Sequence, residues 1–164
     1  MAEKNIEKVQ EEFDLEKNVT IKSIANWETT FQRSTTIGDV VVAPNGSMRL
    51  TRNEIIAQVQ TANKLFSGND GQGSHATYYI DDVATRRHLG FESDDGINKQ
   101  KVFTDDLVKE VFNIKSQASF EEKCKDAFQT RAEKYSLIQA IKRLKINDYT
   151  KIRFAEEYTG HKVM

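Results

Sequence analysis

Hydrophobic and polar positions alternate through much of the first half of the chain, which is the pattern of half-buried β-strands. Turn-forming residues separate the alternating runs at 34–38 and 44–46. Trp27 and Phe31 fall on the same face of their run, so we expect both rings in the hydrophobic core. The predicted strands are residues 19–24, 27–33, 40–42, 48–50 and 76–80.

A helical pattern interrupts the strands between residues 51 and 67. Thr51 and Glu54 have the spacing of a capping box, in which each side chain accepts a hydrogen bond from the other residue's backbone N–H. Gly68 permits the left-handed conformation that often ends a helix. We therefore predict one continuous helix, whose apolar face consists of Ile55, Ile56, Val59, Ala62 and Phe66.

Three glycines lie within residues 68–73, after the predicted helix. Phosphate-binding loops have the opposite order, with a strand before the glycines and a helix after them, so the pattern does not favour one here. A calcium loop is also excluded, because no ligands follow at alternating positions. The segment is predicted to be a mobile connection. The alternative is a surface loop that contacts a protein partner through Asn69, Asp70, Gln72 and His75.

From residue 104 onward the hydrophobic pattern becomes helical. Thr104 and Asp148 are predicted N-caps, and Gly160 is predicted to end the last helix. Ser119 and Glu122 have the spacing of a second capping box, which predicts a helix that begins there and ends between 128 and 131. The other predicted helices are residues 83–89, capped by Asp82, and residues 105–112, 132–145 and 149–158.

These elements predict an α+β fold with three parts. Residues 18–103 form a small, mostly antiparallel β-barrel or sandwich with one packed helix, and residues 97–103 are either a further strand or a linker. Residues 104–164 form a helical bundle or helical hairpins. Residues 1–17 are an acidic arm with a narrow apolar stripe, which is either a frayed tail or a segment that docks on another subunit. The stripe consists of Ile6, Val9 and Phe13.

Composition agrees with a molecule that has a large surface. Only 38% of the 164 residues are hydrophobic, whereas 30% are charged, so we expect a two-part molecule or one that completes its burial in an assembly. A net charge of −1 excludes a generally polybasic nucleic-acid binder. The single cysteine, Cys124, excludes an internal disulfide and a thiolate metal cluster, and we expect it to be a buried structural thiol. The sequence has no secretory or membrane-spanning run, which predicts cytoplasmic synthesis and no membrane partner.

Residues that could carry catalysis do not form a recognisable group. His75, His88 and His161 lie in three different segments without a metal-ligand spacing. Ser74 and His75 are neighbours whose side chains would point apart on a strand, which is poor geometry for a nucleophile and its base. We therefore expect no catalytic residues, no metal and no cofactor. An enzyme would need a pocket that brings His75 or His88 against a carboxylate.

Basic residues are concentrated near the C-terminus. Two helices with a shared basic face would be able to enter a nucleic-acid groove, although any solvated helical hairpin gives the same pattern. This is the basis of an alternative function, a nucleic-acid-binding accessory protein. Its contact residues would be Arg131, Lys134, Lys142, Arg143, Lys145, Lys151 and Arg153.

Three segments, at residues 27–33, 38–46 and 47–51, resemble the small β-modules of tailed-bacteriophage virion proteins, and so does a β-module joined to a helical tail. The resemblance implies a non-enzymatic structural protein of a phage particle: a capsid-associated, connector or tail component present in many copies. It also implies that the partners are other protein subunits, that the chain forms part of a homo-oligomer or larger assembly, and that the protein is incorporated into the virion.

Overall fold

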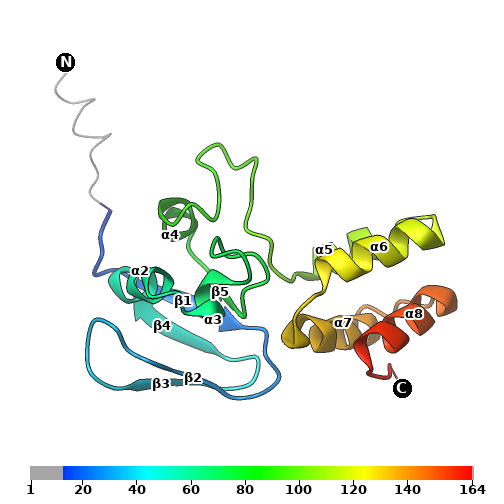
Figure 1. Cartoon of the computed structure of the whole chain (residues 1–164), viewed down its shortest axis with the longest axis horizontal. Coiled ribbons are helices and arrows are strands. Elements are labelled where there is room, and N and C mark those ends of the chain that lie inside the picture. Colours follow the sequence, from blue (N-terminus) through cyan, green and yellow to red (C-terminus); the bar gives the residue numbers. More distant parts are fainter. Residues whose placement is uncertain (1–12, 164) are drawn as a thin grey trace.

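The computed structural model describes residues 13–163, and the fold of this part is α+β, as predicted. Figure 1 shows two lobes side by side, one with strands and helices and the other with helices alone. Each lobe has its own hydrophobic cluster, one of residues between 19 and 91 and the other of residues between 108 and 155. We call them the β-lobe (residues 13–98) and the helical lobe (residues 104–163). Residues 99–103 are the connecting segment, and no strand forms at 97–103.

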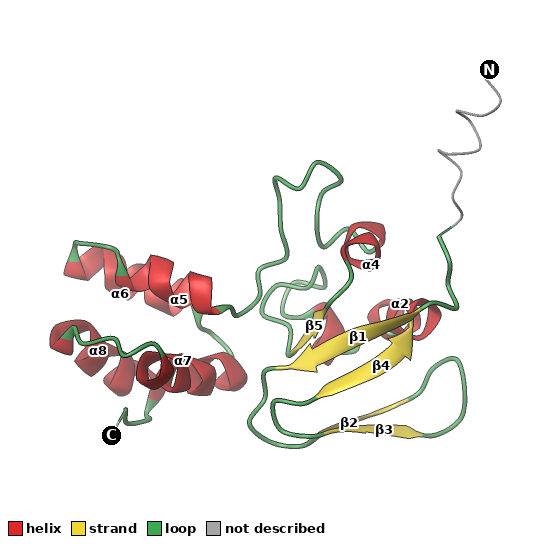
Figure 2. Ribbon diagram, turned by 180° about the vertical axis from the view of Figure 1, so that it is seen from behind, coloured by secondary structure: helices red, strands yellow, loops and turns green. Residues whose placement is uncertain are grey.

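Two antiparallel sheets make up the β-lobe (Figure 2). In the first sheet, β1 (Asn18–Ser23) lies between β4 (Ser47–Thr51) and β5 (Tyr78–Ile80). In the second sheet, β2 (Thr29–Gln32) pairs with β3 (Asp39–Val42). Buried and exposed positions alternate along these strands, so one face of each sheet is turned toward the core.

A closed barrel, one of the two arrangements predicted for the strands, does not form within residues 13–163. In this part of the chain no strand of the three-stranded sheet pairs with a strand of the β2–β3 hairpin, so the two sheets are separate. They instead contribute side chains to one shared core. Its buried members include Ile21, Leu50 and Ile80 from the first sheet and Phe31, Val40 and Val42 from the second.

The predicted continuous helix at 51–67 is wrong, because two helices occupy this segment. α2 (Arg52–Gln60) and α3 (Lys64–Ser67) are separated by Ala62, whose φ of 60° is left-handed. The Asn63 side chain then accepts from the Leu65 N–H and starts α3. This break directs Phe66 against Phe31, with ring centroids 5.1 Å apart. The spacing of the apolar residues does not predict this turn, after which Phe66 packs against Phe31.

Of the two predicted core aromatics, only Phe31 is buried. Its ring also lies 5.8 Å from that of Tyr78, whose hydroxyl hydrogen-bonds Thr29. Trp27 is only half-buried and outside the core cluster, where the Arg131 guanidinium lies 4.9 Å from the centre of its ring. The prediction for Trp27 is wrong because this residue lies before β2 and faces the other lobe.

Four helices form the helical lobe and pack against one another around its hydrophobic cluster. Cys124 is buried within this cluster, as expected, and burial raises the pKa of its thiol from 9.0 to about 12. The helices are α5 (Asp105–Phe112), α6 (Gln117–Ala127), α7 (Arg131–Arg143) and α8 (Tyr149–Thr159).

Most predicted helix ends are confirmed. Asp82 accepts from the Thr85 N–H at the start of α4 (Val83–His88), and Thr104 and Asp148 cap α5 and α8 in the same way. Gly160 ends α8 in a left-handed conformation.

The second predicted capping box is wrong, because α6 begins two residues before Ser119. Ser116 is its N-cap and accepts from the Ser119 N–H, which places Ser119 inside the first turn. A capping box does form at α7, between Thr130 and Glu133. Within residues 13–163, no helix combines the length and the hydrophobicity that crossing a membrane requires.

Candidate functional site

A histidine–carboxylate pair joins the two lobes. His75 follows the glycine-rich loop, and its Nδ1 lies 2.8 Å from Oε2 and 2.9 Å from Oε1 of Glu133. Glu133 lies in the first turn of α7, and only 1% of its side chain is exposed. The His75 backbone N–H donates to the carbonyl oxygen of Lys101 in the connecting segment at 2.9 Å. His75 is thus fixed by contacts to the connecting segment and to the helical lobe.

Glu133 also accepts hydrogen bonds from the start of its own helix. Its Oε1 receives the backbone N–H of Gln129 and both the N–H and the hydroxyl of Thr130, at 3.1–3.3 Å. Because the carboxylate is an acceptor, Nδ1 of His75 carries the proton, and Nε2 has no hydrogen bond within residues 13–163. His75 and Glu133 line a cleft of about 510 Å³ between the lobes.

The pair supplies a histidine of defined tautomer but no adjacent nucleophile. The Ser74 hydroxyl donates to Asp70 at 2.6 Å, and within residues 13–163 no Ser, Thr or Cys side chain hydrogen-bonds the His75 ring. The same residues contain no group of three or more His, Cys, Asp or Glu side chains that would hold a metal ion. The interlobe cleft thus brings His75 against a carboxylate, which is the arrangement that an enzyme would need, although no nucleophile on the ring and no metal-binding group accompanies it among the described residues. The same pair links the two lobes.

Sequence reasoning missed Glu133, which is 58 residues from His75 along the chain. The available signal was local, since Thr130 and Glu133 have the spacing of a capping box. That signal identifies a helix start, but it does not identify the histidine that the carboxylate meets.

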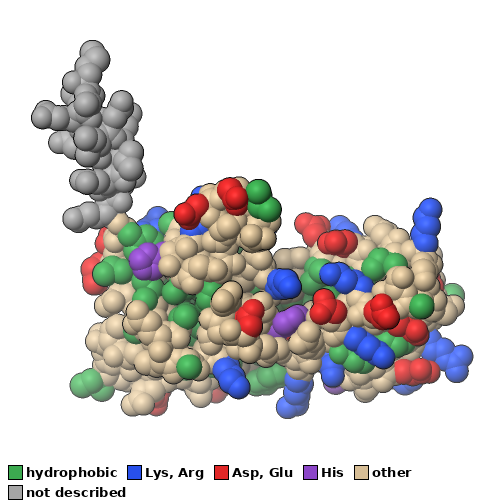
Figure 3. All heavy atoms as spheres, turned by 45° about the horizontal axis from the view of Figure 1, so that its top comes forward, with side chains coloured by type: hydrophobic (Ala, Val, Ile, Leu, Met, Phe, Trp, Pro, Cys, Tyr) green, Lys and Arg blue, Asp and Glu red, His purple; other side chains and the backbone are tan. Residues whose placement is uncertain are grey.

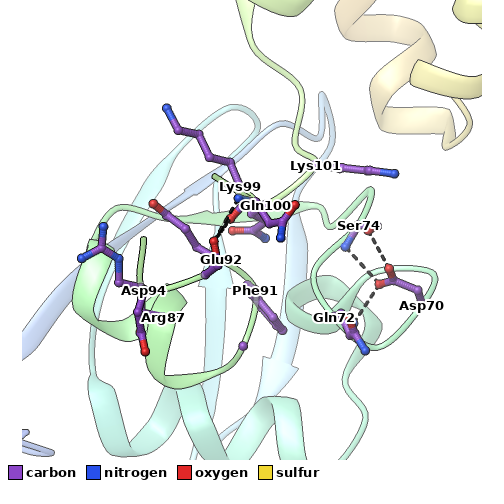
Figure 4. Close-up of a pocket in the computed structure, with 13 residues that line it drawn as sticks. Asp70, Gln72, Ser74, Arg87, Phe91, Glu92, Asp94, Lys99, Gln100 and Lys101 are labelled. Carbon is purple, nitrogen blue, oxygen red and sulfur yellow. Dashed lines mark hydrogen bonds between the residues drawn. The ribbon is translucent and has the colours of Figure 1, made fainter. Parts of the chain in front are cut away.

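The glycine-rich loop is closed by its own hydrogen bonds (Figure 4). Asp70 accepts from the N–H groups of Gln72 and Ser74 as well as from the Ser74 hydroxyl. Burial opposes the change, but these hydrogen bonds hold the pKa of Asp70 below its usual value of 3.8. The segment predicted to be a mobile connection thus contains several internal hydrogen bonds.

Two of the glycines are required by close contacts. A Cβ on Gly68 would lie 2.1 Å from the carbonyl oxygen of Ser74, and one on Gly73 would lie 2.7 Å from the Phe91 ring. The Gly73 carbonyl accepts from Nε2 of Gln100 at 3.1 Å. The buried Oε1 of Gln100 has no hydrogen-bond partner within residues 13–163. Gln100 lines both the interlobe cleft and a second, polar cleft of about 650 Å³.

The four loop residues predicted to contact a partner divide into two pairs. His75 and Asn69 reach across to the helical lobe, since Nδ2 of Asn69 lies 3.5 Å from Oε1 of Gln129. Asp70 and Gln72 are exposed beside the polar cleft. Figure 3 shows acidic and basic side chains on the surface where the lobes meet. Part of the predicted partner surface therefore contacts this chain's own second lobe.

Phe13 also contacts its own chain. Its ring stacks on that of His88, with centroids 4.3 Å apart, and the Arg52 guanidinium lies 4.4 Å from the ring centre. Arg52 in turn pairs with Asp82. The Phe13 ring is thus partly buried against its own chain, and its contact with another subunit stays a prediction. Ile6 and Val9 lie outside the described residues.

The seven basic residues of the nucleic-acid alternative do not share one role. Lys151 is buried, and its Nζ donates to the carbonyl oxygens of Phe112 and Ile114. Arg143 pairs with Asp105.

Most of the other basic residues also contact their own chain. Arg153 pairs with Glu157, Arg131 lies over Trp27, and Nζ of Lys134 lies over the Tyr158 ring. Lys142 and Lys145 are exposed and form no ion pair or ring contact within residues 13–163. The nucleic-acid function stays a prediction.

The loop between β2 and β3 presents an apolar side chain on a fixed backbone. Glu54 does not complete the predicted capping box with the Thr51 N–H; its carboxylate instead accepts from the backbone N–H groups of Ser34 and Thr35 at 2.9–3.2 Å. The Thr51 half of the box does form, since its hydroxyl accepts from the Glu54 N–H. Ile37, at the tip of this anchored loop, is fully exposed.

A scan against protein-family models and searches of curated proteins and of solved structures find no match to the chain.

Proposed function

We propose that this chain is a non-enzymatic structural protein that acts through protein–protein contacts as a subunit of a larger assembly. The observation that carries the proposal is Ile37, a fully exposed large aliphatic side chain on a loop that the buried Glu54 anchors. When the backbone that carries an exposed apolar side chain is already fixed, binding costs little additional backbone entropy. More of the favourable free energy of burying that side chain then contributes to binding.

The surroundings of Ile37 support an interface. Val41, on β3 of the same hairpin and four residues after Ile37, is 49% exposed. Large exposed hydrophobic side chains that lie together are typical of interaction sites, whereas isolated ones are common on any protein surface. The hairpin of β2 and β3 is therefore the surface on which we place the first contact.

The kind of assembly follows from the resemblance to tailed-phage virion proteins. On this proposal the chain is a capsid-associated, connector or tail component, present in several copies and incorporated in the virion. Two lobes with separate cores suit such a role, because one lobe is able to bind a neighbour while the other contacts a different subunit.

The proposal is tested by the mass of the intact protein in solution, measured by light scattering over a wide range of concentration. We expect a species heavier than the 18.8 kDa monomer, and we expect Ile37→Ser to shift the mass toward the monomer. Ile97→Ser is the matched control, because Ile97 is also a strongly exposed isoleucine but lies outside the hairpin. A mass of 18.8 kDa at every concentration would contradict self-assembly.

A further inference from the structure

The hydrogen-bond pattern of the β2–β3 hairpin determines which backbone groups point outward. The Arg33 N–H donates to the carbonyl oxygen of Gly38 at 2.8 Å, so residues 33 and 38 are a hydrogen-bonded pair. In an antiparallel ladder such pairs alternate with pairs that are not bonded to each other. With the observed register, Val40 opposite Phe31 is therefore bonded, and Val41 opposite Thr30 is not. The N–H and C=O of Val41 point away from β2.

Asp39 shares this outward orientation, because it lies two residues before Val41 and opposite Gln32. The carbonyl oxygen of Gln32 confirms the assignment on the other strand: it points outward and accepts from Nε2 of Gln58 at 2.8 Å. The outer edge of β2 is thus partly satisfied by α2, whereas that of β3 is open.

Within residues 13–163, no hydrogen bond reaches the backbone of Asp39 or Val41 from outside the hairpin. Figure 2 shows β3 at the periphery of the β-lobe. An open edge strand with unpaired N–H and C=O groups is a template for pairing with another strand.

We propose that two copies of this chain pair through β3, antiparallel, about a two-fold axis at Val41. The inference rests on the proposed function, and it names the surface and the partner, a second copy of the chain. The product would be a continuous sheet with the strand order β2–β3–β3–β2.

The register between the two β3 strands follows from which backbone groups point outward and which side chains face the core. Pairing Val41 with Val41 of the second copy sets two outward-pointing N–H groups opposite two outward-pointing carbonyl oxygens, which is the geometry of a hydrogen-bonded pair. It also places the buried Val40 opposite the equally buried Val42, and Asp39 opposite Ala43. A shift by one residue would set core-facing side chains against solvent-facing ones.

Side-chain chemistry fits the same register. No two like charges face each other, since the only charged residue of the strand, Asp39, meets an alanine. The two exposed Val41 side chains come together on the outer face, and each hairpin tip with Ile37 runs toward the turn at residues 43–46 of the second copy. The pairing therefore brings the two exposed Val41 side chains together and places each Ile37 beside the second copy.

Substitution of Val41 separates edge pairing from folding. Val41→Pro removes an N–H that the β2–β3 ladder does not use, so the hairpin keeps its hydrogen bonds while the outer edge loses a donor in each copy. Val41→Thr is the matched control, because it keeps the N–H and a β-branched side chain. We expect the proline variant to weaken dimerisation roughly tenfold or more, with the threonine variant close to the parent chain.

A cross-linking pair of variants tests the same geometry without relying on proline. Opposed residues of a hydrogen-bonded pair have Cα atoms about 5.5 Å apart, which is within the range that a disulfide spans. Val41→Cys is therefore expected to form a disulfide-linked dimer under mild oxidation. The control is Val83→Cys on α4, because Val83 is 43% exposed and Val41 49%. The native Cys124 is buried and does not interfere.

Three outcomes are distinguishable. Loss of the dimer with Val41→Pro, together with selective cross-linking of Val41→Cys, would support the pairing. An oligomer that Val41→Pro leaves intact, with equal cross-linking of the two cysteine variants, would overturn the β3 pairing while leaving the proposed assembly function in place. A monomeric parent chain would overturn the β3 pairing and self-assembly, and the proposed function would then require contacts with other proteins.

Discussion

Glu54 lies in the first turn of α2 with its side chain buried, and its carboxylate accepts from the backbone of Ser34 and Thr35. A buried carboxylate is costly unless its oxygens are hydrogen-bonded, and here the loop supplies the missing donors. The same contact fixes the loop that carries Ile37. At the scale of single residues, the position of Ile37 on the surface proposed for assembly thus depends on the buried Glu54 carboxylate.

Glu54→Gln tests this contact. The glutamine amide has one acceptor oxygen and directs its NH₂ group toward N–H donors, so at least one loop N–H loses its partner. We expect the free energy of unfolding to fall by about 1–3 kcal/mol, measured by urea denaturation followed by circular dichroism. Glu122→Gln on the exposed face of α6 is the control and should leave stability unchanged. Equal stability of both variants would contradict the role assigned to Glu54.

At the scale of elements, α8 is bound to the end of α5 by a lysine. Nζ of Lys151 lies 2.7 Å from the carbonyl oxygen of Phe112, the last residue of α5, and 2.5 Å from that of Ile114. Carbonyl groups at a helix C-terminus lack intrahelical partners and carry partial negative charge, so a cation stabilises them. Lys151 is thus a packing residue of the helical lobe, although the sequence pattern placed it among candidate nucleic-acid contacts.

Lys151→Met should therefore destabilise the helical lobe. Methionine fills a similar volume but leaves two carbonyl oxygens without their donor, for which we expect a loss of about 1–3 kcal/mol. Thermal unfolding measured by calorimetry would report it, beside Lys142→Met, an exposed lysine of α7 whose replacement should have little effect. The assigned role fails if the two variants melt at the same temperature.

At the scale of the whole molecule, the contacts between the lobes are mostly polar. His75 binds Glu133, Asn69 reaches Gln129, and the Ser136 hydroxyl donates to the carbonyl oxygen of Ile24 at 3.0 Å. Each lobe has its own hydrophobic cluster, so we expect these hydrogen bonds and the Arg131–Trp27 contact to set the relative placement of the lobes. The connecting segment beside them carries two exposed lysines, Lys99 and Lys101.

Breaking the His75–Glu133 contact should expose the connecting segment. His75→Asn suits the left-handed backbone at this position but is too short to reach Glu133 in the same way. We expect limited trypsin digestion at Lys99 and Lys101 to be several-fold faster than in the parent chain, because local opening controls cleavage. His88→Asn, outside the interlobe contact, is the control. Equal cleavage rates would show that the pair does not hold the lobes together.

Local signals in the sequence predicted the helix ends that depend on one or two neighbouring side chains. Asp82, Thr104 and Asp148 cap their helices as expected, because an N-cap needs only its own side chain and an N–H two or three residues later. At α6, two serines three residues apart both fit the pattern, and the sequence favoured Ser119 over the correct Ser116. At Ala62 the helix breaks although no glycine or proline lies there to indicate a break.

The sequence by itself determined the α+β class, the order of the elements and most of their boundaries, because periodicity and capping are local properties of the chain. Only the tertiary structure decided what each polar residue contacts. Glu54 meets a loop 20 residues away and Glu133 meets His75 across 58 residues, distances over which sequence spacing carries no information. The outward orientation of Val41 likewise follows from the register of β2 against β3, which is fixed when the strands pair.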